Sequence, residues 1–358
     1  MSFFHFLPTA YDNLPEDGLF VWTAPSNIAL VKYWGKKENQ IPANPSVSFT
    51  LSKCKTITKL AYKRKDNDKT ISFDLLFEGQ PKEDFKPKIE KFLQRILPYC
   101  PFIFDYHLKI DTSNTFPHSS GIASSASGMA ALAVNLMSVE RQLAPEMTDQ
   151  YFNEKASFLA RLGSGSACRS IVGRVVVWGE HTDIQGSSDL FGVTLNDIHP
   201  IFTNFHDTIL LVDKGEKQVS STIGHELMHD HPFAAQRFEQ AHHNLSEMKL
   251  VLKSGDLPKF IEIVESEALT LHSMMLTSIP YFILMKPNTL EIINKVWRYR
   301  RDTSIPVCFT LDAGANVHLL YPDNVSVQVM QFITDELVVY CQNGQYICDR
   351  IGQGAERI

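Results

Sequence analysis

The chain has 358 residues, of which 44% are hydrophobic and 21% are charged, which is typical of a folded globular protein and excludes disorder over its length. This length predicts two compact units or one large α/β body. A formal net charge of −6 argues against nucleic-acid binding by broad phosphate neutralisation, although a local basic pocket for a small anion stays compatible with it.

The chain is expected to be cytoplasmic and to bind neither membranes nor nucleic acid. Its start, MSFFHFLPTAYDNLPEDG, has no basic region followed by an apolar run, and no apolar run approaches the roughly 18 residues of a membrane span. The cysteines lack CxxC spacing, which favours free thiols over disulfides or a zinc knuckle. They are Cys54, Cys100, Cys168, Cys308, Cys341 and Cys348.

The first half of the chain alternates strand and helix patterns. Runs of β-branched and aromatic residues predict strands at 46–51, 56–63, 70–77, 103–110 and 172–178. Apolar residues at helical spacing predict helices at 89–96, 126–137 and 148–161, the last starting at Thr148 and stopping at Gly163. The polar segment 181–192 is predicted to be a surface loop.

A new pattern begins at 208–213 and defines the second half. Helices are predicted at 238–252, 261–275 and 290–299, followed by a strand at 306–314. The change lies near 195–206, so the predicted domains are 1–200 and 201–358. Because strands and helices do not alternate strictly, the predicted class is α+β and not a doubly wound sheet.

The stretch FPHSSGIASSASGMAALAVNL, residues 116–136, places small hydroxyl residues where a helix starts. The first N–H groups of a helix lack intrahelical partners and attract anions. Gly121 permits close backbone approach, and Ser124, Ser125 and Ser127 add hydroxyl donors, so we expect these four residues to contact phosphate. The alternative is a capping box with close helix packing.

A second stretch of this kind, RLGSGSACRS, covers residues 161–170. Its small residues lead to Arg169, whose guanidinium can bind phosphate or carboxylate through two parallel hydrogen bonds. Neither stretch contains the GK[ST] of a P-loop, so a nucleotide would be held differently.

Together with three further motifs, these stretches resemble the diphosphomevalonate decarboxylase family of the GHMP kinase superfamily. The motifs occur in the family's order and are APSNIALVKYWGKK (24–37), NPSVSFTLS (44–52), FPHSSGIASSASGMAAL (116–132), RLGSGSACRS (161–170) and FTLDAGAN (309–316). The resemblance implies the two-domain GHMP fold, with a ribosomal protein S5 domain 2-like N-terminal domain that binds ATP and a ferredoxin-like C-terminal domain.

The activity implied by the resemblance is the ATP-dependent decarboxylation of (R)-5-diphosphomevalonate to isopentenyl diphosphate in the mevalonate pathway. The products are ADP, phosphate and carbon dioxide, Mg²⁺ accompanies ATP, and the site lies between the domains. A homodimer is a family expectation. The alternatives are a phosphomevalonate decarboxylase or a mevalonate 3-kinase, although a 3-kinase is expected to lack part of the set Lys32, Arg169 and Asp312.

The resemblance also assigns the catalytic residues. Asp312 would be the general base for the tertiary hydroxyl, Lys32 would neutralise developing charge, and Arg169 would contact the substrate carboxylate or diphosphate. Without the resemblance, Asp312 reads as a turn residue at a strand end, and Lys32 as a lysine with its head group in water.

Further contacts carry over from the family motifs. The substrate-binding set is Tyr33, Lys36, Ser164, Ser166, Arg169 and Ser221, and the ATP-binding set is Gly121, Ser124, Ser125 and Ser127. Trp34 is expected to pack. The sequence departs from the family pattern at Thr222, where some relatives carry an arginine near the diphosphate, and at Pro45 and Ala315, where the change bears on loop geometry.

HELMH, residues 225–229, matches the H-E-x-x-H zinc motif and leaves a zinc hydrolase as a remote alternative. A zinc site would need a third ligand and a helix long enough for both histidines. Gly224 precedes the motif and Pro232 follows it closely, so we expect a coincidental match and no metal ligand set on the protein.

Overall fold

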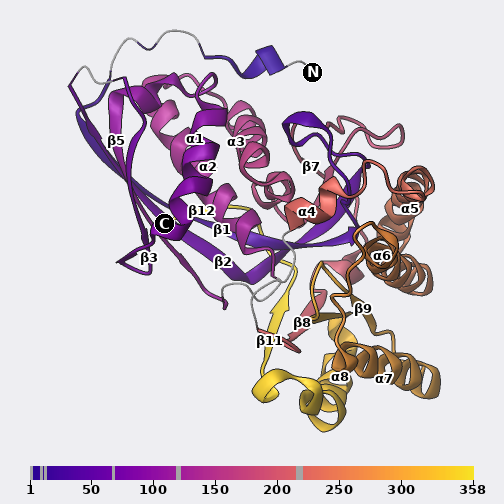
Figure 1. Cartoon of the computed structure of the whole chain (residues 1–358). Helices are drawn as coiled ribbons and strands as arrows, with labels where there is room; N and C mark the ends of the chain where they lie inside the picture. The colour runs from indigo at the N-terminus through magenta and orange to yellow at the C-terminus, as the bar shows by residue number, and fades with distance from the viewer. Residues whose placement is uncertain (1–2, 9–10, 12–13, 67–68, 118–121, 215–220) are drawn as a thin grey trace.

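A computed structural model describes residues 3–8, 11, 14–66, 69–117, 122–214 and 221–358, without the side chains of residues 221 and 222. Two sheets organise this part of the chain, and helices cover one side of each (Figure 1).

The first sheet is built mainly from the first half of the chain. Its strand order is β12-β1-β2-β5-β3-β4, with β6 pairing to β2 and β7 pairing to β6. All pairings are antiparallel except that of β3 with β5. The strands are β1 (Asp17–Val31), β2 (Ser46–Arg64), β3 (Ser72–Phe77), β4 (Gln80–Pro81), β5 (Tyr106–Asn114), β6 (Val175–Trp178), β7 (Val193–Thr194) and β12 (Glu356–Arg357).

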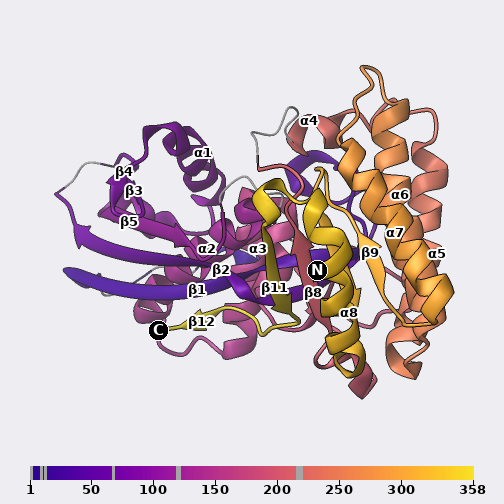
Figure 2. The same ribbon diagram turned by 90° about the horizontal axis from the view of Figure 1, so that it is seen from below.

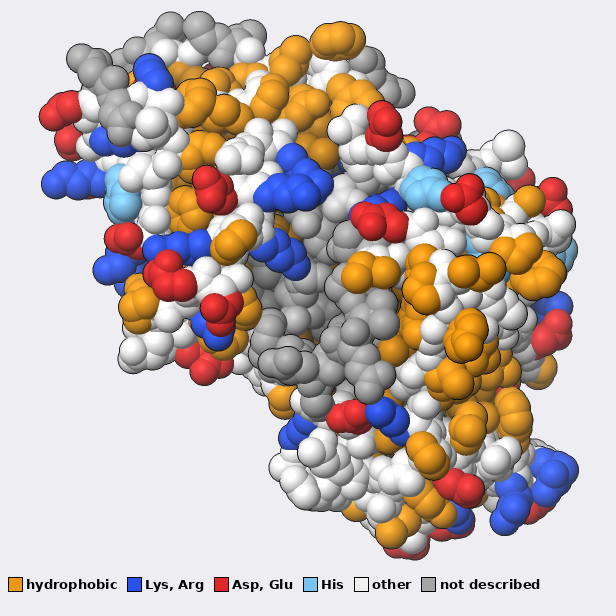
Figure 3. All heavy atoms as spheres, viewed as in Figure 1, with side chains coloured by type: hydrophobic (Ala, Val, Ile, Leu, Met, Phe, Trp, Pro, Cys, Tyr) orange, Lys and Arg blue, Asp and Glu red, His pale blue; other side chains and the backbone are white. Residues whose placement is uncertain are grey.

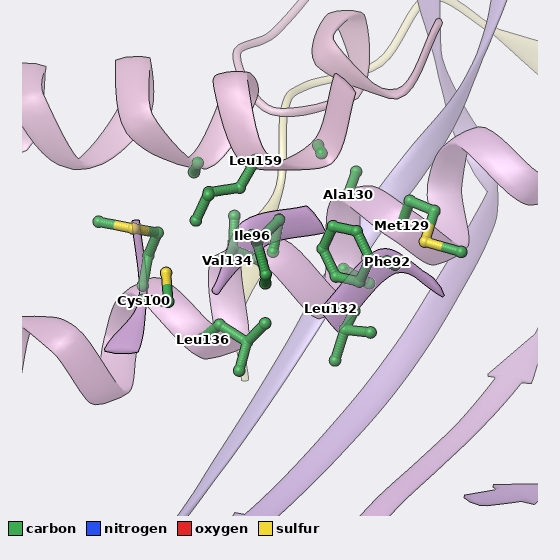
Figure 4. Close-up of a cluster of buried hydrophobic side chains, with 14 of the residues drawn as sticks. Phe92, Ile96, Cys100, Met129, Ala130, Leu132, Val134, Leu136 and Leu159 are labelled. Carbon is green, nitrogen blue, oxygen red and sulfur yellow. The ribbon is translucent and has the colours of Figure 1, made fainter. Parts of the chain in front are cut away.

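Three helices cover one face of this sheet, namely α1 (Lys86–Ile96), α2 (Ser124–Leu143) and α3 (Asp149–Gly163). Their apolar side chains form the first core, in which α2 is buried over most of its length. Figure 4 shows side chains of all three helices meeting there, among them Phe92 and Ile96 of α1, Met129 of α2 and Leu159 of α3. This core fixes the start of α2, where a phosphate site is predicted.

The second sheet has the order β11-β8-β10-β9 and is antiparallel throughout. Its strands are β8 (His206–Leu210), β9 (Cys308–Thr310), β10 (Val317–Tyr321) and β11 (Tyr346–Arg350). The helices of this half are α4 (Ser221–Glu226), α5 (Ala234–Ser254), α6 (Leu257–Thr277), α7 (Pro287–Thr303) and α8 (Ser326–Phe332). Figure 2 shows α5, α6 and α7 side by side on one flank of the molecule.

The two halves share a core because β1 and β2 extend beyond the first helical layer. The far halves of these strands pack with β8 and α5, and the rings of Phe49, Phe202, Phe205 and Phe260 contact one another in this shared core. The end of β1, after which Lys32 follows, therefore lies against elements of the second half.

The predicted helices are confirmed, and the structure extends each of them. Thr148 caps α3 by accepting a hydrogen bond from the Tyr151 N–H at 3.2 Å, and the helix ends at Gly163 as expected. The segment 181–192 is a loop as predicted, but it is not wholly at the surface, because Ile184, Leu190 and Phe191 are buried.

The strand predicted at 70–77 begins at Ser72, and the other predicted strand boundaries need four corrections. The strands at 46–51 and 56–63 are one strand, β2, because the Asp349 carboxylate accepts the N–H groups of residues 52–54 and keeps the chain extended there. Residues 101–105 form a 3₁₀ helix opened by Pro101, so β5 begins later than predicted. The strand at 172–178 starts only at Val175, after Arg174 at a positive φ of 67°.

The strand predicted at 306–314 pairs with β10 only over Cys308–Thr310. The chain then turns at Ala313–Gly314, where the Gly314 N–H donates to the Asp312 carbonyl at 2.7 Å. Asp312 consequently lies in the loop after β9 and not at the strand end itself.

All six cysteines are free thiols, as their spacing predicts. Within the described ranges, the chain has no helix that combines the length and the apolar character needed to cross a membrane. On the face shown in Figure 3, basic and acidic side chains are interspersed.

Candidate active site

The centre of the candidate site is an ion pair between the two halves of the molecule. The Lys32 Nζ atom, just after β1, lies 3.1 Å from Oδ1 of Asp312, just after β9. The Lys32 side chain is 2% exposed, whereas that of Asp312 is 28% exposed. The lysine is thus fixed in the interior, and the carboxylate remains accessible to a ligand.

Burial lowers the pKa of the Lys32 ammonium, because its charged form loses hydration. The negative charge of Asp312 opposes this effect, and the positive charge of Arg169 reinforces it. The three side chains therefore form one electrostatic group.

Arg169 lies in a 3₁₀ helix, Gly165–Ser170, and is buried. Its Nε and Nη2 atoms donate to Oδ1 of Asn27 at 3.4 and 3.3 Å, and Nη1 donates to the Ser46 hydroxyl. Burial lowers the pKa of the guanidinium, and the negative charge of Asp312 opposes that shift. Two cations and one carboxylate leave this group with net positive charge, which suits an anionic ligand.

The two small-residue stretches of the sequence meet in space. The hydroxyls of Ser125, at the start of α2, and Ser164, after α3, are 3.3 Å apart. Ala123, the N-cap residue of α2, adopts the left-handed conformation with φ 42°. Its side chain makes no capping hydrogen bond. The capping-box alternative therefore does not describe the start of α2.

A mostly apolar cavity of about 200 Å³ opens beside this helix start. Ser124 and Ser125 line it, and the rest of its wall comes mainly from α1, α2 and strands β2, β3 and β5. The remaining lining residues are Thr56, Thr58, Leu75, Phe77, Phe85, Lys88, Ile89, Ile110, Thr112, Asn114, Gly128, Met129 and Leu132.

Ser127 lies differently from its neighbours. Its hydroxyl is fully buried, 2.6 Å from the Thr56 hydroxyl, and it also donates to the Ser124 carbonyl. These contacts pack α2 on β2, so a phosphate contact by Ser127 stays a prediction that its burial does not support. Gly121 falls outside the described residues, as does the side chain of Ser221.

The remaining substrate-site candidates surround the KYWGK segment. Gly165 packs tightly against the Tyr33 ring and Trp178, and it separates the half-exposed Ser164 and Ser166. Burial raises the pKa of the Tyr33 phenol, which keeps it neutral. The Lys36 ammonium lies 3.5 Å from the Glu226 carboxylate. Trp34 is buried, as its packing role predicts.

HELMH packs onto the same segment. Nδ1 of His225 accepts the Gly35 N–H at 3.0 Å, and its ring centroid lies 4.2 Å from that of Tyr33 and 4.7 Å from that of Trp34. Burial and the charge of Lys36 lower the pKa of His225 to about 3. Helix α4 ends at Glu226, before the second histidine, and the described residues contain no cluster of three His, Cys, Asp or Glu able to hold a metal.

Two departures from the family pattern fall in packed turns. Pro45 lies against Gly179, where the backbone φ is +107°. The carbonyl of Ala315 accepts a hydrogen bond from the Thr289 hydroxyl at 2.7 Å, which fixes the turn after Asp312.

Sequence reasoning missed the buried polar residues that hold the charged group in place. Asn27 and Ser46 accept from Arg169, while Glu267 and His272 of α6 contact the backbones of Lys32 and Asp312. The sequence does contain a signal for such residues. The segment FIEIVESEALTLHSMM, residues 260–275, places charged and imidazole side chains on an otherwise apolar helix, where buried polar groups need partners.

Comparison with known proteins identifies the family. A model of the diphosphomevalonate decarboxylase-like N-terminal domain matches residues 24–190, and a model of the mevalonate 5-diphosphate decarboxylase C-terminal domain matches residues 208–353. The diphosphomevalonate decarboxylase of Candida albicans is 30% identical over 328 residues, which span 87% of this chain and 86% of the relative. The chain belongs to the diphosphomevalonate decarboxylase family.

Solved structures of diphosphomevalonate decarboxylases also superpose on the chain. One, of the Enterococcus faecalis enzyme and its mevalonate diphosphate-mediated ATP binding, is 27% identical with a TM-score of 0.80, covering 96% of this chain and 99% of that one. Another, described as "MDDEF in complex with MVAPP, AMPPCP and Magnesium", is 28% identical with a TM-score of 0.81 and the same coverage. These matches confirm the predicted GHMP kinase fold.

Proposed function

We propose that this protein is a diphosphomevalonate decarboxylase, which converts ATP and (R)-5-diphosphomevalonate to isopentenyl diphosphate, ADP, phosphate and carbon dioxide. The observation that carries the proposal is the ion pair of Lys32 and Asp312 beside Arg169. In this group Asp312 is a base that a ligand can reach, and Lys32 and Arg169 are cations that suit an anionic substrate.

The chemistry requires a base at the tertiary hydroxyl of the substrate. We infer that Asp312 accepts this proton as the hydroxyl oxygen takes the γ-phosphoryl group of ATP, with ADP leaving. Loss of carbon dioxide then supplies the electron pair that forms the alkene and expels the new phosphate. The partial exposure of the Asp312 side chain supports this role.

Arg169 is proposed to bind the substrate carboxylate or diphosphate. Its guanidinium is held by Asn27 and Ser46, so it is already oriented before a ligand arrives. Tyr33, Lys36, Ser164, Ser166 and Ser221 are proposed to complete the substrate site.

Lys32 is proposed to stabilise the negative charge that develops on the transferred phosphoryl group, which requires the protonated amine. Because burial places its pKa below the ordinary value for lysine, activity should be retained below this pKa and fall as the pH rises through it. Measurement of kcat against pH should show this alkaline decline. In Lys32→Arg, whose side chain stays protonated, the decline should vanish at a lower maximal rate; an unchanged alkaline limb would assign it to another group.

The cavity beside α2 is proposed to hold the nucleoside of ATP. Its apolar walls suit a flat base, and Ser124 and Ser125 at the start of α2 would direct hydroxyl and N–H donors to the phosphates. Gly121 is proposed to permit the same approach. When bound, Mg²⁺ would neutralise phosphate oxygens, and it typically needs only one or two protein carboxylates.

Replacing Ser124 by alanine should mainly impair the use of ATP. Loss of one hydroxyl donor to a charged phosphate should raise KM for ATP by about tenfold, with a smaller change in KM for diphosphomevalonate. Steady-state kinetics against each substrate would measure this, with Ser138→Ala as the matched control for a buried serine of the same helix that is not a candidate ligand. Equal KM values for ATP in wild type and Ser124→Ala would remove this residue from the nucleotide site.

Incubation with ATP and 5-diphosphomevalonate tests the proposed function directly. Carbon dioxide and ADP should appear in equal amounts. Release of ADP without carbon dioxide would instead indicate a 3-kinase, and a preference for 5-phosphomevalonate would indicate the related decarboxylase. No turnover of any of these substrates would overturn the proposal.

We also propose a cytoplasmic homodimer with domains at 1–200 and 201–358. The resemblance to the family supports the dimer, and the two separate sheets support the division, with β1 to β7 in the first sheet and β8 to β11 in the second, although β12 at residues 356–357 joins the first. Sedimentation of the purified protein would measure the subunit number, and a monomer at micromolar concentration would contradict the dimer.

A further inference from the structure

The backbone of Lys32 is held by side chains and not by a neighbouring strand. Pairing of β1 with β2 ends at Val31. The Lys32 N–H then donates to Oε2 of Glu267 at 2.8 Å, and its carbonyl accepts from Nη2 of Arg237 at 3.0 Å. The carbonyl also accepts from the Asn44 amide at 2.9 Å. The N–H and the carbonyl of Lys32 are therefore both held by side chains at the point where strand pairing has ended.

Glu267 is itself immobilised. Its two carboxylate oxygens accept from Nη1 and Nη2 of Arg237 at 3.0 and 2.6 Å, and Oε1 also accepts from Asn244 at 2.6 Å. The Glu267 and Arg237 side chains are both 0% exposed. A paired carboxylate and guanidinium in the interior define one geometry, because any displacement leaves a buried charge without its partner.

The backbone of Asp312 is held from the same helix. Nε2 of His272 lies 3.1 Å from the Asp312 carbonyl, which lies beyond the end of β9. Burial lowers the pKa of His272 to about 4, so the imidazole is neutral at physiological pH and must carry its proton on Nε2 to donate here. The carbonyl keeps a second donor, the Gly314 N–H.

Glu267 and His272 both belong to α6, which packs against β1 and β9 (Figure 2). They are five residues apart, or about 7.5 Å along the helix axis. We propose that α6 is the positioning element of the active site, with Glu267 and His272 as positioning residues that set Lys32 and Asp312 at their working separation. This inference rests on the proposed function, because it assigns Lys32 and Asp312 to the reaction.

A role in positioning predicts a loss of rate and not of binding. In His272→Leu the Asp312 carbonyl keeps the Gly314 N–H, so folding should tolerate the change. The backbone of Asp312 would nevertheless lose its contact with α6, and a small misplacement of the carboxylate that it carries should lower kcat by about tenfold or more. KM for both substrates should stay within about twofold, because the binding groups remain.

His272→Gln is the conservative variant. The glutamine Nε2 can occupy the position of the imidazole Nε2 and donate to the same carbonyl, so most of the lost rate should return. A residue that merely fills space would show the opposite order, with leucine better tolerated than glutamine in this apolar setting. If His272→Leu does not fold, His272→Asn replaces it, since the asparagine amide ends near Nδ1 and is too short to reach.

Glu267→Gln is best compared with Glu265→Gln on the same helix. Glu265 is also buried and accepts from Nη1 and Nη2 of Arg300 at 2.7 and 3.0 Å, but it joins α6 to α7 and β9. Both variants should lower the melting temperature, because each removes the carboxylate that pairs with an arginine, the buried Arg237 or the partly buried Arg300. Only Glu267→Gln should also lower kcat, since only Glu267 contacts Lys32.

Three results decide between the hypotheses. If the wild-type enzyme releases no carbon dioxide from diphosphomevalonate, the proposed function itself is contradicted, and the variants are not needed to show this. If the wild type is active, wild-type kcat in folded His272→Leu overturns the inference alone. Equal losses of kcat in the Glu265 and Glu267 variants overturn it as well, because the effect then follows helix stability.

Discussion

Replacing Asp312 by asparagine is expected to lower kcat at least a hundredfold while ATP still binds. The amide keeps the shape of the side chain but cannot accept the hydroxyl proton, and loss of a general base typically costs about this much. Lys32 also loses its partner at 3.1 Å. The rate of carbon dioxide release measures the loss of kcat, and calorimetry with ATP measures whether ATP still binds.

The matched control is Asp302→Asn, at an exposed aspartate of α7 that pairs with Arg301. Its activity should equal that of the wild type. Undiminished turnover in Asp312→Asn would remove Asp312 from the role of base, and a parallel loss of ATP binding would point to a distorted site.

Replacing Arg169 by methionine is expected to lower kcat/KM for diphosphomevalonate at least about thirtyfold, the lower range for removing one partner of a buried charged contact. Methionine keeps the apolar stem but removes the cation that faces the substrate. Arg169→Lys should recover only part of the loss, because an ammonium cannot reproduce the fork that contacts Asn27 and Ser46. Initial rates at varied diphosphomevalonate concentration measure both variants.

Arg161→Met controls for removal of a buried arginine. Arg161 lies on α3 and donates to the carbonyls of Leu190 and Asn39, so its loss should lower the melting temperature. If Arg161→Met matches the kinetic loss of Arg169→Met, the effect of Arg169 belongs to folding and not to substrate binding.

Local patterns in the sequence were sufficient to predict much of the fold. Helix α3 carries its own start and stop signals, Thr148 and Gly163, and α2 shows apolar residues at helical spacing. The two serine-containing stretches were also visible as candidate ligand sites, although only the folded chain brings Ser125 and Ser164 to 3.3 Å.

What could not be predicted depends on contacts between distant segments. The extended course of β2 through Ser52 relies on Asp349, about 300 positions later, and the end of β9 depends on where β10 stops pairing. The roles of Glu267 and His272 also depend on distant contacts, because the sequence of an apolar helix does not show which residue a buried polar side chain will contact. The resemblance to the family points to the reactive side chains in the sequence, but only tertiary packing identifies what holds them.

The last strand of the chain pairs with the first: Glu356 and Arg357 of β12 lie opposite Thr23 and Trp22 of β1. This edge of β1 therefore stays open until residues 356–357 have paired with it, and an open strand edge invites pairing with other chains. A polypeptide cut before residue 356 would expose the same edge.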